Sequence, residues 1–461
     1  MSLIKSISGI RGTIGGKPGE GLSPLDVVKY TAAYAEWVLR SVNKRKAMVV
    51  TGRDARPSGE MINKIITATL TAMGIDVLDL GLATTPTVEI AVASEKASGG
   101  IILTASHNPV QWNALKLLNG KGEFVTAADG AEILEIAESM DYCFTSYDKI
   151  GKLVHTGDYN KKHIEMLLAL PDINVEKIKE RDFTVVIDCV NSVGGLILPD
   201  LLRSLGVKNI IEIFTEPTGI FPHNPEPLPE NLGELRKTVI SRGADLGFVV
   251  DPDVDRLAIV SEDGTCFNEE YTLVACADYI LSKQKGNTVS NMSSSRALRD
   301  ITEKHGGKWY FSAVGEVNVI AKMKEVEAVI GGEGNGGVIY PPLHYGRDAL
   351  AGIALFLSLL AESELTCSQL KATYPDYVIS KNRIDLPDSS MAEKIIRKIN
   401  EELEQKVVSK EDGLLLEDER GWVNIRKSNT EPILRIYSEG KTSQDADRLA
   451  EEIIKFVKKI I

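Results

Sequence analysis

The sequence contains fewer basic residues than acidic ones. Its 461 residues include 53 lysines and arginines against 65 aspartates and glutamates, which gives a formal net charge of −12. Proteins that bind nucleic acid without sequence preference need clustered Lys and Arg, so we expect no nucleic-acid partner. A small anionic substrate is still allowed, because a few local cations or a metal ion reverse the field within one cleft.

Long apolar runs and paired cysteines are also missing. No segment approaches the ~20 apolar residues that span a bilayer, and the first residues do not form a basic region followed by an apolar signal core. The five cysteines are scattered, odd in number and without a Cys-x-x-Cys pair. This pattern is typical of a reduced protein, so we expect a cytoplasmic chain with no membrane partner.

What the sequence does contain is a repeated order of elements. With 43% hydrophobic residues, a chain of this length predicts about three or four globular domains. Three segments each show a strand, a helix, a glycine and a second strand, followed later by an apolar strand that opens into a polar loop. The three later strands are predicted at 101–103, 246–250 and 328–330. Loops at the carboxyl ends of such strands bind ligands in α/β sheets, so the three loops are expected to share a cleft.

The last 90 or so residues differ, because alternating strands there are combined with helices in the pattern of an α+β domain. The predicted fold is therefore three similar α/β domains with mixed sheets plus a C-terminal α+β domain, arranged around one central cleft. The predicted boundaries are 1–150, 151–257, 258–372 and 373–461.

The first polar loop, residues 104–109, places Ser106 at the end of a buried strand. Pro109 removes a backbone donor and disfavours helix at the preceding residue, so the chain must turn there. Nearby, His107 is a candidate proton carrier and Lys116 a fixed positive charge. The alternative is a surface turn in which the serine caps a helix.

The second loop carries Asp251, Asp253 and Asp255 at every second position. In an extended loop this spacing places three carboxylates on one side, where they repel one another unless a cation lies between them. Ligands that are all oxygen favour Mg²⁺, with Arg256 as a further cation beside it. The alternatives are a solvated acidic turn or a Ca²⁺ loop, although the Gly and Glu of an EF-hand are absent.

The third loop, residues 331–337, holds five glycines around Glu333 and Asn335. Glycine lets a backbone approach a ligand closely, and a carboxylate with an amide can bind neighbouring sugar hydroxyls. The Lys-Ser/Thr of a phosphate-binding P-loop does not follow, and a flexible surface turn is the alternative. Near the amino terminus, Arg11 lies between glycines and can present its guanidinium to an anion.

A fourth group of polar residues lies in the C-terminal domain. Two guanidinium groups, two hydroxyls and an amide suit a phosphate monoester that does not react, whereas the alternative is a polar hairpin tip. The residues are Arg426, Ser428, Asn429, Thr430 and Arg435.

Taken together, these motifs resemble the α-D-phosphohexomutase family over essentially the whole chain and in the family's order. Thr104-Ala-Ser106-His-Asn-Pro109 is similar to the phosphoserine loop and Asp251-x-Asp253-x-Asp255-Arg256 to the magnesium loop. Gly332-Glu-Gly-Asn-Gly-Gly337 lies where the sugar-specificity loop belongs, and Arg426-x-Ser-Asn-Thr-Glu-Pro432 is similar to the phosphate-binding loop.

The sequence departs from the common family pattern at the sugar loop. Asn335 and Gly337 replace the usual Ser and His, a variant similar to a divergent branch of phosphoglucosamine mutases that also includes phosphoglucomutase and phosphomannomutase activities. In addition, Pro252 stands where Gly is usual, and Asn113-Ala114 where Asn-Gly is frequent.

The resemblance implies interconversion of hexose 6-phosphate and hexose 1-phosphate, with glucosamine phosphate as the expected substrate. It implies a phosphate on Ser106, Mg²⁺ bound by that phosphate and the three aspartates, and a hexose 1,6-bisphosphate as activator. His107, Lys116, Arg256 and Arg11 would assist, and the chain would be a monomer or homodimer. Other readings are a phosphoglucomutase/phosphomannomutase with the same mechanism, a metal-dependent sugar phosphatase, and a sugar-phosphate binder without catalysis.

Overall fold

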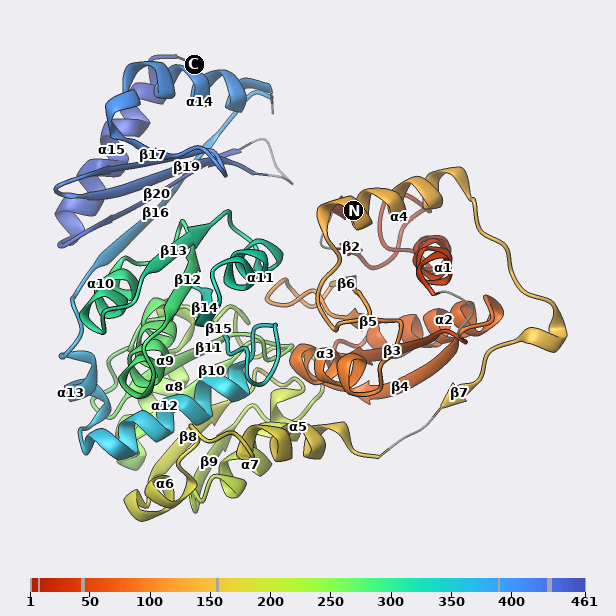
Figure 1. Cartoon of the computed structure of the whole chain (residues 1–461), viewed down its shortest axis with the longest axis horizontal. Coiled ribbons are helices and arrows are strands. Elements are labelled where there is room, and N and C mark those ends of the chain that lie inside the picture. Colours follow the sequence, from red (N-terminus) through yellow and green to blue (C-terminus); the bar gives the residue numbers. More distant parts are fainter. Residues whose placement is uncertain are drawn as a thin grey trace. The chain divides into compact units, whose positions relative to one another are not determined.

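The computed structural model describes residues 2–6, 9–42, 46–154, 157–388, 390–428 and 433–460. Figure 1 shows the whole chain, which divides into two compact units. The first combines residues 1–272 with 336–370, and the second combines 273–335 with 371–461. Each unit is described separately.

The first unit begins with a seven-stranded mixed sheet in the order β1-β2-β6-β5-β3-β4-β7. The central strands β4, β3 and β5 are parallel, whereas β6, β2 and β1 continue the sheet antiparallel. The strands are β1 (Leu3–Ser6), β2 (Gly9–Thr13), β3 (Met48–Arg53), β4 (Asp76–Leu82), β5 (Gly99–Leu103), β6 (Trp112–Leu118) and β7 (Leu153–Val154). The helices of this part are α1 (Pro24–Ser41), α2 (Gly59–Ala72), α3 (Thr85–Ser94), α4 (Ala127–Ser139) and the 3₁₀ helix η1 (Tyr147–Lys149).

Local sequence explains where the longest of these helices begins. Ser23 caps α1 by accepting the backbone N–H of Asp26, while the Asp26 side chain accepts the N–H of Ser23, and Pro24 occupies the first turn. This reciprocal cap satisfies donors that the first turn otherwise leaves unpaired. One face of α1 is buried, as at Tyr34, and packs with α2 and α4 in the core on the sheet.

Residues 184–261 form a second sheet of four strands, in the order β11-β10-β8-β9. Strands β9, β8 and β10 are parallel and β11 is antiparallel to β10. The strands are β8 (Thr184–Asp188), β9 (Asn209–Ile213), β10 (Leu246–Val250) and β11 (Leu257–Ser261). The helices are α5 (Tyr159–Leu168), α6 (Val175–Arg181), α7 (Gly194–Ser204), η2 (Pro229–Asn231) and α8 (Gly233–Arg242).

Residues 336–370 return to the first unit as β15 (Gly337–Ile339) and α12 (Ala349–Ser363). Helix α12 is apolar on nearly all sides and buried over most of its length, which is the pattern of a helix that lies inside a protein. Its Phe356 contacts Phe248 and Phe267 edge to face. The Leu- and Ala-rich stretch of α12 therefore packs within its own chain.

In the second unit, strands β13, β12 and β14 form a parallel arrangement. They are β12 (Asn287–Asn291), β13 (Trp309–Ser312) and β14 (Ala328–Glu333), joined by α10 (Ala297–Lys304) and α11 (Glu316–Glu325). Helices α9 (Glu269–Lys283) and α13 (Cys367–Lys371) each include residues of both units.

The three parallel strand groups share one topology. In each, the first strand lies between the next strand along the chain and the one after it: β3 between β4 and β5, β8 between β9 and β10, and β12 between β13 and β14. The first two polar loops follow β5 and β10 as predicted, but the third prediction is wrong at its start, because β14 continues through residues 331–333, where Gly331 and Gly332 pair with β12. The predicted threefold repeat of an α/β unit is therefore confirmed.

The C-terminal domain is a five-stranded antiparallel sheet in the order β16-β20-β19-β18-β17. Helices α14 and α15 cover one face, where an apolar core includes Ile395, Ile425, Ile436 and Ile453 (Figure 1). The elements are β16 (Val378–Asp385), α14 (Ser390–Glu402), η3 (Glu404–Lys406), β17 (Val407–Ser409), β18 (Leu414–Asp418), β19 (Gly421–Lys427), β20 (Ile433–Gly440) and α15 (Ser443–Lys458). The predicted fold class, three α/β domains and an α+β domain, is confirmed.

Two further expectations concern the whole chain. None of the helices in the described ranges is both long and apolar enough to cross a membrane. All five cysteines are free thiols.

Candidate active site

Ser106 lies in the loop after β5 with an unusual backbone. Its φ is +48°, a left-handed conformation that side chains other than glycine seldom adopt. The backbone N–H of Ser106 donates to Thr104 Oγ1 (2.9 Å), and its hydroxyl donates to Asp251 Oδ2 (2.7 Å). The side chain is buried, and its oxygen is thereby aimed at the acidic loop that follows β10. Such strain is usual at functional sites.

Arg56, on the loop between β3 and α2, fixes this conformation. Its guanidinium is completely buried, bonded to Asp54 through Nε (3.0 Å), and packed 4.9 Å from the ring of Phe221. Its terminal nitrogens donate to four carbonyl oxygens of the serine loop, those of Ser106, Asn108, Pro109 and Trp112. A charged, rigid donor with four acceptors holds a loop far better than surface contacts do.

The three aspartates converge as predicted, but the predicted extended loop is wrong. The segment is a turn in which the Val254 N–H donates to the Asp251 carbonyl (3.1 Å), and Val254 has φ +63°. The turn, rather than alternation along a strand, brings the carboxylates together. One oxygen from each of the three lies within 4.8 Å of the others, and all three side chains are fully buried.

Buried cations stand beside two of these carboxylates. Lys116 Nζ lies 2.7 Å from Asp253 Oδ2, which also accepts the Thr85 hydroxyl (2.6 Å), and Arg347 Nη2 lies 2.5 Å from Asp255 Oδ2. Within the described part of the chain, the other oxygens, Oδ1 of Asp253 and Oδ1 of Asp255, are buried and have no hydrogen-bond partner.

The protonation behaviour of the cluster follows from these contacts. Burial raises the pKa of Asp251, and the neighbouring Asp255 and Asp253 raise it further. Burial also opposes charge on Asp253, but the Lys116 ammonium outweighs it and lowers the pKa of Asp253. Two buried carboxylate oxygens that accept no hydrogen bond, and a third carboxylate with a raised pKa, are what a divalent cation would relieve. The residues present therefore fit a metal ion bound by oxygen ligands, and the triad could hold one.

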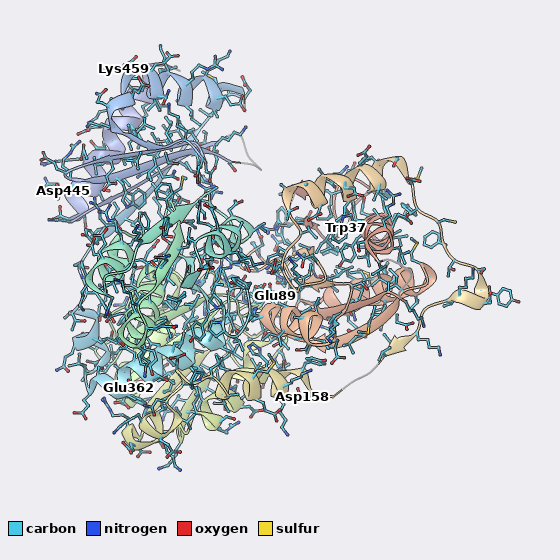
Figure 2. All side chains as sticks on the ribbon, viewed as in Figure 1. Trp37, Glu89, Asp158, Glu362, Asp445 and Lys459 are labelled. Carbon is cyan, nitrogen blue, oxygen red and sulfur yellow. The ribbon has the colours of Figure 1, made fainter. Side chains whose placement is uncertain are left out.

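Arg347 is itself held in place by the residue that follows it. Asp348 caps α12 by accepting two backbone N–H groups, and its other oxygen bonds His163 Nε2 (2.9 Å) and His344 Nε2 (3.1 Å). Burial alone would raise the pKa of Asp348, but His163 and His344 lower it. Glu89, labelled in Figure 2, stands 3.4 Å from His344 Nδ1 and ties this cluster to α3.

The remaining predicted residues of the first unit are Arg11, Arg256 and His107. Arg11 Nη1 donates to Asn108 Oδ1 (2.9 Å), and burial lowers its pKa. Arg256 Nε lies 3.7 Å from Asp255 Oδ1, and its Nη1 lies 3.7 Å from Glu226 Oε1. His107 Nε2 lies 3.8 Å from the same glutamate oxygen. Burial, together with Arg256 and Arg11, lowers the pKa of His107 to about 2, so this imidazole is uncharged at neutral pH.

In the second unit, Glu333 ends β14 and is buried. Its Oε1 accepts Asn291 Nδ2 (2.8 Å) and the Gly315 N–H (3.1 Å), and its Oε2 accepts Asn335 Nδ2 (3.4 Å). The predicted sugar-binding pair is thus brought together and held in a fixed orientation.

Arg426 and Arg435 lie opposite each other on β19 and β20. Ser428 follows β19, and its N–H donates to the Ile433 carbonyl (3.0 Å). Asn429 and Thr430, the other two predicted phosphate ligands, lie outside the described residues.

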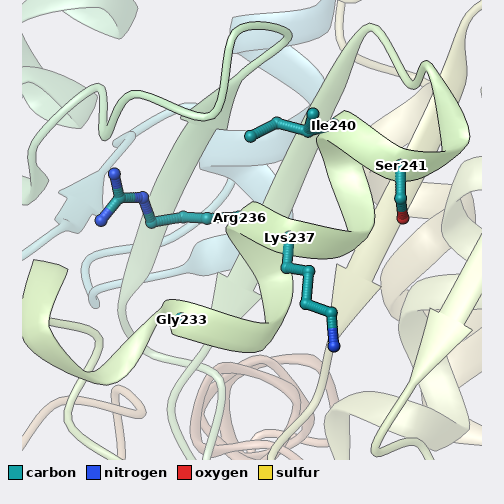
Figure 3. A pocket seen from close by; sticks show the side chains of 5 residues that line it. All are labelled: Gly233, Arg236, Lys237, Ile240 and Ser241. Atoms are coloured by element: carbon teal, nitrogen blue, oxygen red, sulfur yellow. The ribbon is translucent and has the colours of Figure 1, made fainter.

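A separate hollow on the surface of the first unit contains none of these residues. It is lined by Gly233, Arg236, Lys237, Ile240 and Ser241, all on α8 (Figure 3).

Comparison with known proteins identifies the family. Four family models for phosphoglucomutase/phosphomannomutase match the chain in order, the three alpha/beta/alpha domains at residues 3–142, 161–264 and 268–377 and the C-terminal domain at 384–456. The chain belongs to the α-D-phosphohexomutase family.

Individual relatives of the family agree. The chain is 35% identical to the phosphoglucomutase/phosphomannomutase of Thermococcus kodakarensis, over 98% of each chain. It is 31% identical to a protein of Methanopyrus kandleri named probable phosphoglucosamine mutase, over 98% of this chain and 97% of the other. Among solved structures, a phosphoglucomutase/phosphomannomutase family protein from Burkholderia thailandensis superposes with a TM-score of 0.86 at 26% identity, covering 99% of this chain and 97% of that one.

Several residues at this phosphohexomutase site were not among those predicted. Thr85, Arg347 and Glu226 contact predicted residues but come from distant parts of the chain, and no local motif marks them. Arg56 lies in the short polar sequence Arg53-Asp54-x-Arg56 at the end of β3, and this cluster of charges at a strand end is the signal that could have identified it.

Proposed function

We propose that this phosphohexomutase interconverts glucosamine 6-phosphate and glucosamine 1-phosphate through a phosphate carried on Ser106. The observation that carries the proposal is the Ser106 hydroxyl, 2.7 Å from Asp251 in a buried cluster with two carboxylate oxygens unpaired among the described residues. Relatives named probable phosphoglucosamine mutase support the choice of sugar.

Asp251, Asp253, Asp255 and the oxygen on Ser106 would hold Mg²⁺. When bound, the ion supplies positive charge that stabilises the phosphoryl group as it transfers. Lys116 and Arg347 would keep one oxygen of Asp253 and one oxygen of Asp255 engaged, which would leave the other oxygen of each carboxylate to bind the ion.

The reaction would run in two transfers. In the first, the phosphoryl group leaves Ser106 Oγ for the free hydroxyl of the bound sugar phosphate, which gives up its proton and becomes a bisphosphate. The intermediate then turns over, and the phosphoryl group at its other end returns to Ser106 Oγ. A hexose 1,6-bisphosphate added as activator would phosphorylate the serine in the same way.

The cations around Ser106 would have different roles. Although burial opposes its charge, Asp253 and Asp255 raise the pKa of Lys116, which therefore stays charged and can stabilise the transferring group. Arg11 and Arg256 would add charge at the serine loop. The uncharged His107 would contribute a hydrogen bond rather than a positive charge.

Residues of the second unit would bind the substrate. Glu333 and Asn335 would bind sugar hydroxyls, while Arg426, Ser428, Asn429, Thr430 and Arg435 would grip the phosphate that does not react. We also propose the domain boundaries 1–150, 151–257, 258–372 and 373–461.

A second candidate shares this mechanism but acts on glucose and mannose phosphates. The name of the Thermococcus kodakarensis relative favours it.

The test is a parallel mutase assay on glucosamine, glucose and mannose phosphates, with Mg²⁺ and the matching bisphosphate. A kcat/KM for glucosamine phosphate more than ~10-fold above the others, about 1.4 kcal/mol of discrimination, supports the first proposal. Comparable or greater activity on the other hexoses supports the second, and release of inorganic phosphate without isomerisation would indicate a phosphatase.

Ser106→Ala tests the phosphoserine itself. We expect turnover to fall by at least about 10³-fold, because the group that carries the phosphate is lost, while hexose phosphate still binds. Intact mass measurement should show one phosphate on the wild-type chain and none on the variant. Unchanged turnover would refute the mechanism.

A further inference from the structure

Three arginines stand side by side across three neighbouring strands of the C-terminal sheet. Arg383 on β16 pairs with Arg435 on β20, and Arg435 pairs in turn with Arg426 on β19. Residues directly opposite in antiparallel strands share one face, with their Cβ atoms about 5 Å apart. The three side chains therefore form a continuous row, which we call the arginine row.

The row lies on the face of the sheet that the helices leave open. The neighbours Ile384, Ile436 and Ile425 point into the core with α14 and α15, so the row points the other way. At the far end of the same face, Trp422 and Ile379 pack against Met292 and Phe311. Tyr437 belongs to the same cluster, and Arg426 Cζ lies 6.0 Å from the centre of its ring, so the row borders the packed end on one side and the segment that carries Ser428 on the other.

The charges in the row are not balanced. Among the described residues, no hydrogen bond or ion pair connects an acidic side chain to any of the three, and the buried Nε atoms of Arg426 and Arg435 have no acceptor. Burial lowers the pKa of Arg426 and the neighbouring Arg435 lowers it further, partly opposed by Asp412. Like charges placed directly opposite each other destabilise a sheet, so the fold by itself gives no reason for this arrangement.

We propose that Arg383 is a third arginine of the phosphate-binding site and that the complete row makes the site selective for a doubly charged phosphate monoester. This inference rests on the proposed function, since the ligand is the phosphate of the hexose phosphate. Arg426 begins the phosphate-binding motif and Arg435 follows its last residue by three positions, whereas Arg383 is 43 residues before Arg426 and reaches the site only through strand pairing.

The chemistry of the ligand explains why a third guanidinium is useful. A phosphate monoester has three terminal oxygens and carries close to two negative charges at neutral pH, because its second pKa is about 6. A sulfate ester of the same shape carries only one charge. Each guanidinium offers two parallel donors, so a third one favours the ligand with more charge and more acceptor capacity.

The test compares Arg383→Gln with Arg383→Lys in the Ser106→Ala background, where bound ligand is not turned over. Calorimetry measures the Kd of glucosamine 6-phosphate and of glucosamine 6-sulfate. We expect Arg383→Gln to weaken phosphate binding about 10-fold and sulfate binding about threefold or less, and Arg383→Lys to recover part of the loss. In the phosphorylated enzyme, Arg383→Gln should raise KM with little change in kcat.

Arg448→Gln is the matched control, because it removes the same charge from an exposed position on α15, which packs on the opposite face of the sheet. It should leave both Kd values unchanged.

A phosphate Kd for Arg383→Gln within twofold of the control, or equal losses of affinity for phosphate and sulfate, would overturn the inference. If the parallel assay selects another hexose, its 6-phosphate and 6-sulfate replace those of glucosamine. If it finds no mutase activity, the proposed function fails separately, and inorganic phosphate then serves as the probe for Arg383.

Discussion

The two regions for which we propose anion binding treat charge in opposite ways. Around Ser106, charged groups of opposite sign meet in buried pairs, Lys116 with Asp253, Arg347 with Asp255 and Arg56 with Asp54. On the C-terminal sheet, by contrast, three arginines stand in line without an acidic partner among the described residues. The charges of the first region are balanced without a ligand, whereas the second has positive charge that the proposed phosphate would neutralise.

This difference fits the two tasks that we propose. A group that reacts must be held in a fixed orientation, which buried ion pairs with full hydrogen bonding achieve. A group that only anchors a substrate gains more from donors that remain unsatisfied until the anion binds, because the binding energy is then not spent on breaking internal contacts. The following predictions test that contrast.

The largest effect is expected where a buried pair is broken. Arg347→Met removes the nearest cation of the buried Asp255 and leaves only the more distant Arg256 (3.7 Å) and Lys116 (3.8 Å), which should lower the free energy of unfolding of the first unit by about 3–5 kcal/mol. Urea denaturation in EDTA measures this, and added Mg²⁺ should restore part of the loss by taking the place of the lost charge. Lys64→Met, which breaks an exposed pair with Glu60, is the control and should cost about 0.5 kcal/mol or less. Equal losses of unfolding free energy for the two variants would contradict the prediction that the buried pair matters more than the exposed one.

In the arginine row, removing one charge should have the opposite effect on stability. Arg435→Gln removes like-charge repulsion, so unfolding of the C-terminal domain should need the same free energy or about 0.5 kcal/mol more. The Kd for hexose phosphate should nevertheless rise by about 10-fold or more, because charged hydrogen bonds are lost. Denaturation measures the change in unfolding free energy, and calorimetry measures the change in Kd for the same variant. A destabilised domain would show that the row is already neutralised in the free protein.

The smallest effect concerns the His223–Asp188 pair, 3.0 Å apart. Burial opposes charge on His223, but the hydrogen bond to Asp188, the negative charge of Asp188 and the Asn224 carbonyl together outweigh it and raise the pKa of the imidazole. A pKa raised on folding stabilises the protein below the unfolded value of about 6.5, and this contribution disappears as pH rises through the folded value. The stability difference between wild type and His223→Gln should therefore be larger at pH 5.5 than at pH 8.5. A difference that does not change with pH would mean that the pair is neutral.

The sequence predicted the parts of the site that lie within single loops. Ser106 and the three aspartates follow apolar strands, and local order alone places them at strand ends. Their mutual contact was inferred from the repeated topology, which the paired strands confirm. The detailed path of the acidic loop was not predictable, because it depends on a left-handed Val254 that sequence would not favour.

Residues that act across long separations were harder to find. Thr85 and Asp253 are 168 positions apart, and Arg347 and Asp255 are 92 positions apart. Arg383 shares a face with Arg435 and Arg426 only because of the register of three strands. Strand register depends on how a whole sheet pairs, so a single sequence carries almost no local signal for it.

The late return of the chain to the first unit has a consequence for synthesis. Arg347 and the buried helix α12 are translated after the three α/β repeats, and Arg347 emerges 92 residues later than the aspartate that it neutralises. At 5–20 residues per second, the acidic loop waits about 5–20 s on the ribosome without this partner. The first unit therefore cannot complete its core while it is being made, and a nascent chain cut before α12 should remain open to proteases that the finished protein resists.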